Sequence, residues 1–260
     1  AAGGDATWRP DDEYNPETLI AVMKSENALS AAGSDGLHFS RLQCILSTSA
    51  GKKGFDLMVG SFWWRSKEQP DAVPPDFWEL FLPSNLTALG KKGHPICVGS
   101  TMRRTLATEV VRQYRLKLED VKLSERQNGV AVSGGAELMG LRAKTHHQLG
   151  HSLIALDCTN AFNSIKRVAI LEEVVVRTPG LTPFVPERYG EKPAGIISQM
   201  DTGERKKISS NTGIHQGDGL GPALFCMPVE PILRKCREQF DALGVELLAY
   251  LDDLLLAMGE

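Results

Sequence analysis

The strongest constraint on the fold is a pair of adjacent acids, Asp252 and Asp253, inside the apolar stretch from Leu247 to Met258. Apolar runs on both sides of a break predict a hairpin of two buried strands with the acids at its turn. An exposed hairpin could place both acids in water, but this stretch lacks the Asn-Gly or Asp-Gly pair that ordinary tight turns favour. Because adjacent buried carboxylates repel each other, the pattern points to a divalent cation such as Mg²⁺ or Mn²⁺, which suits oxygen ligands.

A further carboxylate, Asp157, ends the apolar run from Leu153 to Leu156. This run predicts a buried strand, and a charge at the end of such a strand needs a cation, an arginine or hydrogen bonds. The helical spacing of apolar residues from Ile165 to Val174 predicts that the strand turns at once into a helix, whose first N–H groups could bind a phosphate. Alternatively, Asp157 only caps that helix.

A third segment, from Gly213 to Pro222, contains four glycines in ten residues. Such glycines let the backbone approach a ligand closely, although the segment matches neither the P-loop nor the dinucleotide-binding fingerprint. Pro222 is suited to the first turn of a helix that continues to Phe240. Within it, Pro228 and Pro231 are expected to kink or split the helix.

The rest of the chain predicts a mixture of helices and extended segments. Helical spacing of apolar residues favours helices near 15–31, 37–46, 101–119 and 136–148, whereas extended segments are expected at 77–82, 86–89 and 94–98. The last two extended segments would form a hairpin with a basic tip at 90–93. The Pro/Gly-rich stretch near 179–195 could be an excursion on the surface.

Composition excludes several classes of protein. Hydrophobic residues make up 42% and charged residues 23%, which is typical of a globular chain and not of a disordered or coiled-coil one. No apolar run approaches the ~20 residues that cross a bilayer, and the first ten residues lack a signal-peptide pattern. We therefore expect no membrane partner and an intracellular location, in the nucleus or the cytoplasm.

Two further features of composition limit the candidate sites. Five cysteines without a C-x-x-C pair favour neither a disulfide framework nor a zinc site. A net charge of −3 does not by itself indicate a nucleic-acid partner. Evidence for such a partner must therefore come from local sites.

A strand-end acid, a Gly-rich loop and a Tyr-x-Asp-Asp hairpin, in this order, resemble the palm of the reverse transcriptases, particularly those of non-LTR retrotransposons. The matching segments are DCTNAFNS at 157–164, GIHQGDGLGPALF at 213–225 and YLDD at 250–253. Upstream, residues 32–37, 91–104 (KKGHPICVGSTMRR) and 127–137 (QNGVAVSGGAE) are also similar to that family. The resemblance covers nearly the whole chain.

This resemblance implies an α+β right-hand polymerase fold. Its palm would be an antiparallel sheet backed by helices near 164–176 and 222–240. The implied organisation is a flexible arm at 1–14, helical fingers at 15–150 with a basic hairpin at about 77–98, and a palm at 151–260. Because the chain stops at Glu260, shortly after the acidic hairpin, we expect a truncated palm and no thumb.

The resemblance also assigns the chemistry. Asp157 and Asp252 would hold two Mg²⁺ or Mn²⁺ ions, with the Cys158 backbone carbonyl as a further ligand and Asp253 as a secondary carboxylate. One ion would lower the pKa of the primer 3′-hydroxyl, and the other would neutralise the phosphates of the incoming nucleotide. No protein nucleophile would be required.

Nucleotide contacts are implied for eight residues: Cys158, Asn160, Ala161, Phe162, Gln216, Gly217, Lys91 and Lys92. The N–H groups near Asn160 and Ala161 would meet the triphosphate, which Lys91 or Lys92 could also reach. Phe162 matches the family's steric gate, which would exclude a ribose 2′-hydroxyl and favour dNTPs; its alternative role is core packing.

The expected partners are an RNA template with a DNA primer and a dNTP, and no oligomeric state is predicted. Two alternatives remain. A catalytically inactive remnant acting as a binding module is favoured by His94 and Gly219, where the family usually has arginine and proline. An RNA-dependent RNA polymerase shares the palm chemistry, but Phe162 at the gate position argues against it.

Overall fold

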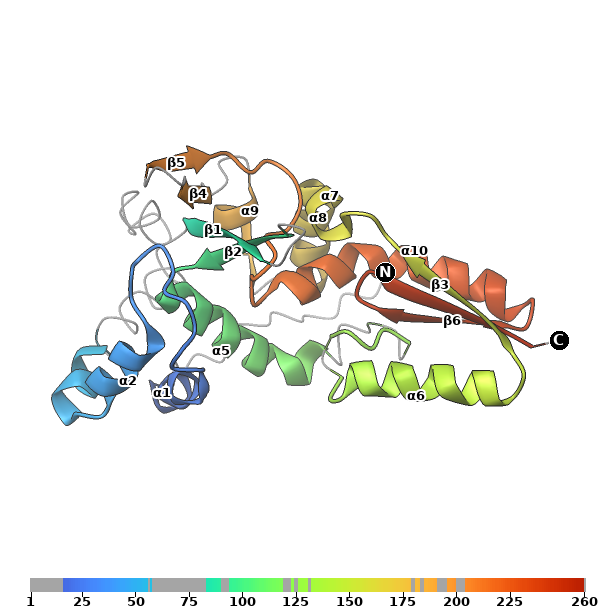
Figure 1. Cartoon of the computed structure of the whole chain (residues 1–260), viewed down its shortest axis with the longest axis horizontal. Coiled ribbons are helices and arrows are strands. Elements are labelled where there is room, and N and C mark those ends of the chain that lie inside the picture. The colour runs from blue at the N-terminus through green and yellow to red at the C-terminus, as the bar shows by residue number, and fades with distance from the viewer. Residues whose placement is uncertain are drawn as a thin grey trace.

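The computed structural model describes residues 16–55, 57, 83–89, 94–118, 123, 126–130, 132–178, 181–182, 185–190, 196–199 and 204–259. Figure 1 shows helices gathered around two separate sheets. One sheet has three strands in the order β3-β7-β6, and the other has four in the order β2-β1-β4-β5. This architecture confirms the predicted α+β fold class.

The three-stranded sheet brings the predicted acids together. Its strands, β3 (Ser152–Asp157), β6 (Val245–Tyr250) and β7 (Asp253–Met258), are all antiparallel. The register pairs Asp157 with Asp253, and Asp253 with Tyr250, at one end of the sheet. The predicted hairpin is therefore present, with Leu251 and Asp252 forming its turn.

Two long helices pack on this sheet. Helix α10 (Gly221–Asp241) contacts β6, and apolar side chains of the sheet surround Leu233 of α10. Helix α6 (Gly135–Gln148) contacts all three strands. Of the two predicted effects of Pro228 and Pro231, a kink or a split, the split does not occur: the 21 residues of α10 form one helix. Its extensive buried face offsets the loss of two backbone N–H donors.

The prediction that β3 is a buried strand is wrong. Among the described residues β3 lies at the edge of its sheet, and most of its residues are exposed. Ile154 and Leu156 retain 42% and 44% of their accessible surface. The reason is that α10 packs on β6, two strands away, and that α6, which does contact β3, leaves most β3 side chains uncovered. Asp157 is consequently exposed to water.

The four-stranded sheet combines strands that are far apart in sequence. Strands β1 (Ser84–Leu89) and β2 (His94–Gly99) form the predicted antiparallel hairpin. Strand β4 (Ile196–Gln199) pairs in parallel with β1 and antiparallel with β5 (Arg205–Ile208), and neither β4 nor β5 was predicted. The extended segment expected at 77–82 and the tip with Lys91 and Lys92 lie outside the described residues.

The remaining helices cover the core. Helix α1 (Pro16–Ser25) contacts both α2 (Phe39–Leu46) and α5 (Thr101–Leu118). The first N–H group of α5, that of Thr101, donates to Asp35 Oδ2 over 2.8 Å, so the Asp35 carboxylate caps this helix. The short helix α7 (Ala161–Ser164) and helix α8 (Arg167–Arg177) follow β3. No described helix is long and apolar enough to cross a membrane.

The stretch expected to be a surface excursion is instead partly buried. Its described part contains α9 (Val185–Tyr189), and Leu181, Val185 and Tyr189 keep no more than 2% of their surface. These three side chains recur every four residues and join the main core. Hydrophobic burial at helical spacing thus overrides the Pro/Gly-rich composition here.

Candidate active site

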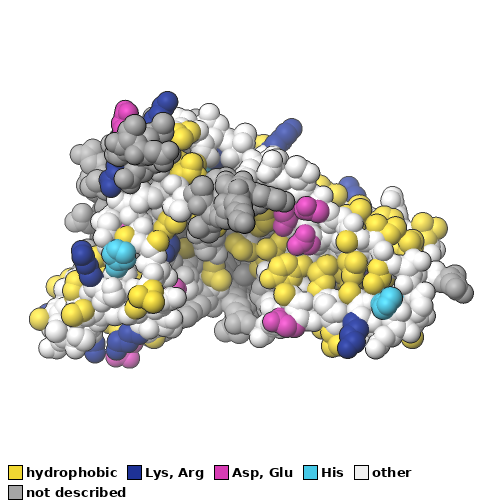
Figure 2. All heavy atoms as spheres, viewed as in Figure 1, with side chains coloured by type: hydrophobic (Ala, Val, Ile, Leu, Met, Phe, Trp, Pro, Cys, Tyr) yellow, Lys and Arg dark blue, Asp and Glu magenta, His cyan; other side chains and the backbone are white. Residues whose placement is uncertain are grey.

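The three predicted acids meet at one end of the β3-β7-β6 sheet. Asp157 ends β3, Asp253 begins β7 directly opposite it, and Asp252 lies in the preceding turn. Asp157 and Asp253 are exposed, whereas Asp252 is half-buried. In Figure 2, acidic side chains border a patch of hydrophobic side chains in the region of β3, β6 and α6. The acids therefore lie on an open face.

The three carboxylates are close enough for the charges of two of them to affect the pKa of the third. Burial raises the pKa of Asp252 above its ordinary value, and the negative charges of Asp253 and Asp157 raise it further. Within the described part of the chain, no group of three or more His, Cys, Asp or Glu side chains is already arranged at metal-ligand spacing. The donor set is nevertheless composed of carboxylates that repel one another, which suits a hard divalent cation.

A cavity of about 470 Å³ opens beside Asp252. Its wall includes the predicted nucleotide contacts Phe162, Gln216 and Gly217. The remaining lining residues come from the Gly-rich segment and the start of α10: His215, Asp218, Gly219, Gly221 and Pro222. This volume lies within the range of small-ligand sites, so the cavity could hold a nucleotide-sized molecule.

Phe162 reaches this cavity from α7 and has a fixed orientation. Its ring stacks on Phe225 of α10, with centroids 4.4 Å apart and planes 12° from parallel. Phe225 is only 4% exposed, so it forms a rigid support. Phe162 thus packs against the core through Phe225 and also lines the cavity, whereas its contact with a nucleotide stays a prediction.

The turn after β3 is tightly closed. Asn160 adopts the left-handed conformation with φ of 53°, which asparagine tolerates better than most residues. The Ala161 N–H donates to the Cys158 carbonyl over 3.2 Å. One of the N–H groups expected to meet a triphosphate is therefore already used within the turn, and the Cys158 carbonyl keeps one lone pair for another partner.

The Gly-rich loop lies against β2. The Cys97 N–H donates to the Gln216 carbonyl over 2.7 Å. Gly217 has a φ of +95°, and a Cβ there would lie 2.9 Å from the Cys97 carbonyl oxygen. Glycine is thus required at this position both for backbone conformation and for close approach. The loop that carries Gln216 is consequently fixed to the β2-β1-β4-β5 sheet.

A buried ion pair holds the other side of the loop. Arg188 and Tyr189 of α9 both bind the Asp218 carboxylate: Arg188 Nε lies 3.0 Å from Oδ2, and the Tyr189 hydroxyl donates to Oδ2 over 2.6 Å. Burial alone would raise the pKa of Asp218, but Arg188 and Arg103 hold it below its ordinary value. Removing one partner from such a pair typically destabilises a protein by about 3–5 kcal/mol.

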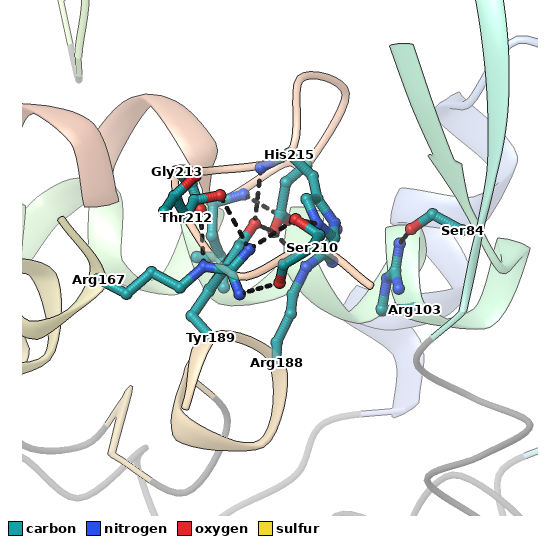
Figure 3. A network of polar contacts seen from close by, with 11 residues as sticks. Ser84, Arg103, Arg167, Arg188, Tyr189, Ser210, Thr212, Gly213 and His215 are labelled. Carbon is teal, nitrogen blue, oxygen red and sulfur yellow. Dashed lines mark hydrogen bonds and ion pairs between the residues drawn. The ribbon is translucent and has the colours of Figure 1, made fainter. Parts of the chain in front are cut away.

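The network continues through His215 and Arg167 (Figure 3). His215 Nε2 lies 3.0 Å from Ser210 Oγ, and burial together with nearby Arg188 lowers the pKa of His215 to about 3, so this imidazole is neutral at physiological pH. The Arg167 guanidinium donates to the carbonyls of Gly213, Thr212 and Ser210. Arginines from α8 and α9 thereby hold both ends of the loop.

The structure brings together Phe162, Gln216, Gly217 and Asp252 on one cavity wall, with Asp157 and Asp253 at the adjacent end of the sheet. Asn160, Ala161 and Cys158 lie in the turn after β3 and not on that wall. Lys91 and Lys92 lie outside the described residues, as does the side chain of His94.

Among the residues that hold the Gly-rich loop, Arg188 and Tyr189 of α9 escaped prediction, as did Arg167. The segment of α9 is rich in Pro and Gly, and a buried arginine leaves no periodic signal of its own. The recurrence of Leu181, Val185 and Tyr189 at every fourth position is the one sequence signal that could have identified this helix as part of the core.

The chain is similar to proteins of known family. The family model described as reverse transcriptase (RNA-dependent DNA polymerase) matches residues 91–260. The retrotransposable element SLACS 132 kDa protein of Trypanosoma brucei gambiense is 31% identical over 182 residues. That match covers 67% of this chain and 15% of the SLACS protein, so the chain spans a small part of this relative.

Solved structures share the fold at low sequence identity. Telomerase from Candida tropicalis, in complex with a fragment of telomeric RNA, matches with a TM-score of 0.51 and 14% identity over 69% of this chain and 36% of that one. Telomerase from Candida albicans, also in complex with such a fragment, matches with a TM-score of 0.52 and 9% identity, over 72% and 40% of the two chains. These matches support the right-hand palm fold.

Proposed function

Because the chain belongs to the reverse transcriptase (RNA-dependent DNA polymerase) family, we propose that it transfers nucleotides from dNTPs to a primer 3′-hydroxyl, directed by an RNA template. One observation carries this proposal. Three carboxylates, those of Asp157, Asp252 and Asp253, lie at one end of a sheet, beside a cavity that Phe162 and Gln216 line. Such an arrangement suits metal-assisted phosphoryl transfer, which requires positioning and charge stabilisation and no protein nucleophile.

The carboxylates are the proposed ligands of two divalent cations, Mg²⁺ or Mn²⁺. Asp157 and Asp252 would hold them, with Asp253 and the Cys158 carbonyl in support. When bound, such ions lower the pKa of the primer hydroxyl and neutralise the leaving pyrophosphate. The raised pKa of Asp252 supports this role, because a cation would offset the repulsion from Asp157 and Asp253.

Phe162 is the proposed selector for deoxyribose. Its ring is held by stacking on Phe225, so it cannot easily swing away from the cavity. A fixed ring on this wall would exclude the extra hydroxyl of a ribonucleotide. Gln216 and Gly217 would contact the nucleotide from the Gly-rich loop. The predicted phosphate contacts remain Asn160, Ala161, Lys91 and Lys92.

We propose further that the chain is the fingers and palm of a polymerase encoded by a non-LTR retrotransposon, with fingers at 15–150 and palm at 151–260. The similarity to the SLACS protein supports this origin. The four-stranded sheet joins β1 with β4, so strands from both proposed units contribute to it. Its partners would be an RNA template, a DNA primer and a dNTP.

Primer extension tests the proposal. A DNA primer annealed to RNA is incubated with the chain, Mn²⁺ or Mg²⁺, and either dNTPs or rNTPs. We expect dNTP incorporation that requires the metal and that Asp252→Asn abolishes. Absence of any incorporation would favour an inactive binding module, and preference for rNTPs would favour an RNA polymerase.

A further inference from the structure

The turn that carries Asp252 contains a strained residue. Leu251 adopts φ of +56°, a left-handed conformation that is unfavourable for a bulky side chain. Such strain persists only where surrounding contacts impose it, and it is frequent at functional sites. The groups that impose it on Leu251 therefore also determine how the neighbouring Asp252 is presented.

One buried side chain, that of Gln127, contacts Leu251 on both sides of its backbone. The Leu251 N–H donates to Gln127 Oε1 over 2.9 Å, and Gln127 Nε2 donates to the Leu251 carbonyl over 3.4 Å. Gln127 is only 1% exposed. Its Oε1 also accepts the Gly129 N–H over 3.0 Å, so the amide itself is held in place. This paired contact spans 124 positions of sequence.

The backbone around Gln127 is fixed to β6. The Asn128 N–H donates to the Ala249 carbonyl over 2.8 Å, and the Ala249 N–H donates to the Arg126 carbonyl over 2.9 Å. Gly129 permits close approach, because a Cβ there would lie 2.6 Å from the Leu251 side chain. Residues 126–129 are thus held by backbone hydrogen bonds and close packing against the β6-β7 hairpin.

We propose that Gln127 is a positioning residue that holds Leu251 in its left-handed conformation and thereby orients the Asp252 carboxylate. This inference rests on the proposed polymerase function, since it assigns a role to that same acid. A residue that acted only on stability would lower the melting temperature of the protein and leave the chemical step unchanged.

The test combines Gln127→Met, which removes both polar groups at similar volume, with Leu251→Gly, which adopts positive φ without strain. We expect Gln127→Met to lower kcat for primer extension at least about tenfold, with a smaller change in KM for dNTP. Adding Leu251→Gly should restore much of the lost kcat, because glycine no longer needs the amide to hold its conformation.

Gln43→Met is the matched control. The Gln43 amide of α2 likewise donates to backbone carbonyls at the end of α1, those of Met23 over 3.0 Å, Glu26 over 2.9 Å and Lys24 over 3.5 Å. It should lower the melting temperature without lowering kcat. If Gln127→Met does not fold, Gln127→Asn retains an amide that is too short to reach Leu251, and its kcat should fall in the same direction.

Hydrogen exchange separates this inference from the proposed function. The Leu251 amide hydrogen should exchange at least about tenfold faster in Gln127→Met than in the wild type. In Gln43→Met its exchange rate should be unchanged. If the wild type shows no polymerase activity, the proposed function fails, but this exchange measurement still tests the positioning role. Unchanged exchange at Leu251, or a loss of kcat that Leu251→Gly does not relieve, would overturn the inference.

Discussion

Gly217→Ala is predicted to displace the Gly-rich loop from β2. The added Cβ would lie 2.9 Å from the Cys97 carbonyl oxygen and 3.0 Å from Ile96 Cγ2, both closer than ordinary contacts. One of these neighbours is backbone in a paired strand, so the loop is the part that must move. Such movement would break the hydrogen bond from the Cys97 N–H to the Gln216 carbonyl.

The magnitude follows from two contributions. Placing an L-residue at the φ of +95° costs about 1–2 kcal/mol, and forcing extra volume into a packed site costs about 1–3 kcal/mol. We therefore expect the free energy of unfolding to fall by about 2–5 kcal/mol, which lowers the melting temperature by about 2–4 °C for each kcal/mol. Because Gln216 lines the cavity, KM for dNTP should rise about tenfold.

Gly244→Ala isolates the backbone contribution. Gly244 has a φ of +70°, but a Cβ there would meet nothing within 4 Å. Gly244→Ala should lower the free energy of unfolding by about 1–2 kcal/mol and leave KM for dNTP unchanged. Urea denaturation and steady-state primer extension measure both quantities. Equal unfolding free energies for the two variants, or an unchanged KM in Gly217→Ala, would refute the close contact between loop and strand.

Two further predictions concern side chains of the cavity. Phe162→Val should reduce the ratio of kcat/KM for dNTP over rNTP by at least about tenfold, because it removes the ring held against Phe225, and an unchanged ratio would contradict the selector role. Asp252→Asn should stabilise the metal-free protein at pH 7. Since its folded pKa is raised, Asp252 opposes folding increasingly as the pH rises above its ordinary value of 3.8, so the gain should vanish below that pH. Thermal unfolding across this pH range would show no such gain if Asp252 were unperturbed.

The acidic hairpin and the strand ending at Asp157 are predictable from sequence because apolar runs bounded by charge leave few alternatives. The same reasoning fails for the burial of β3. Ile154 and Leu156 are as apolar as core residues, but a strand's place in the sheet depends on which strands pair with it, and the burial of its side chains depends on where α10 and α6 pack. Local pattern cannot encode that choice.

The residues that hold the Gly-rich loop and the acidic turn show a second limit of prediction from sequence. Gly217 is marked by its sequence, since several glycines in a short segment imply unusual backbone. The contacts of Arg188 and Gln127 are not marked, although Gln127 begins a segment that resembles the family, because their partners, Asp218 and Leu251, are 30 and 124 positions away. A buried polar side chain acquires its role from a distant contact, and single-sequence periodicity carries no record of such pairs.

Asp157 and Asp252 are proposed to bind, together, the divalent cations that recruit a dNTP. Calorimetric titration of dNTP, with and without Mn²⁺, measures this coupling between metal and nucleotide. Asp241→Asn serves as the control, because Asp241 forms a surface ion pair with Arg126. We expect Mn²⁺ to raise dNTP affinity at least about tenfold in the wild type and in Asp241→Asn, but not in Asp157→Asn or Asp252→Asn. Affinity that is independent of Mn²⁺, or that survives both active-site substitutions, would contradict the claim.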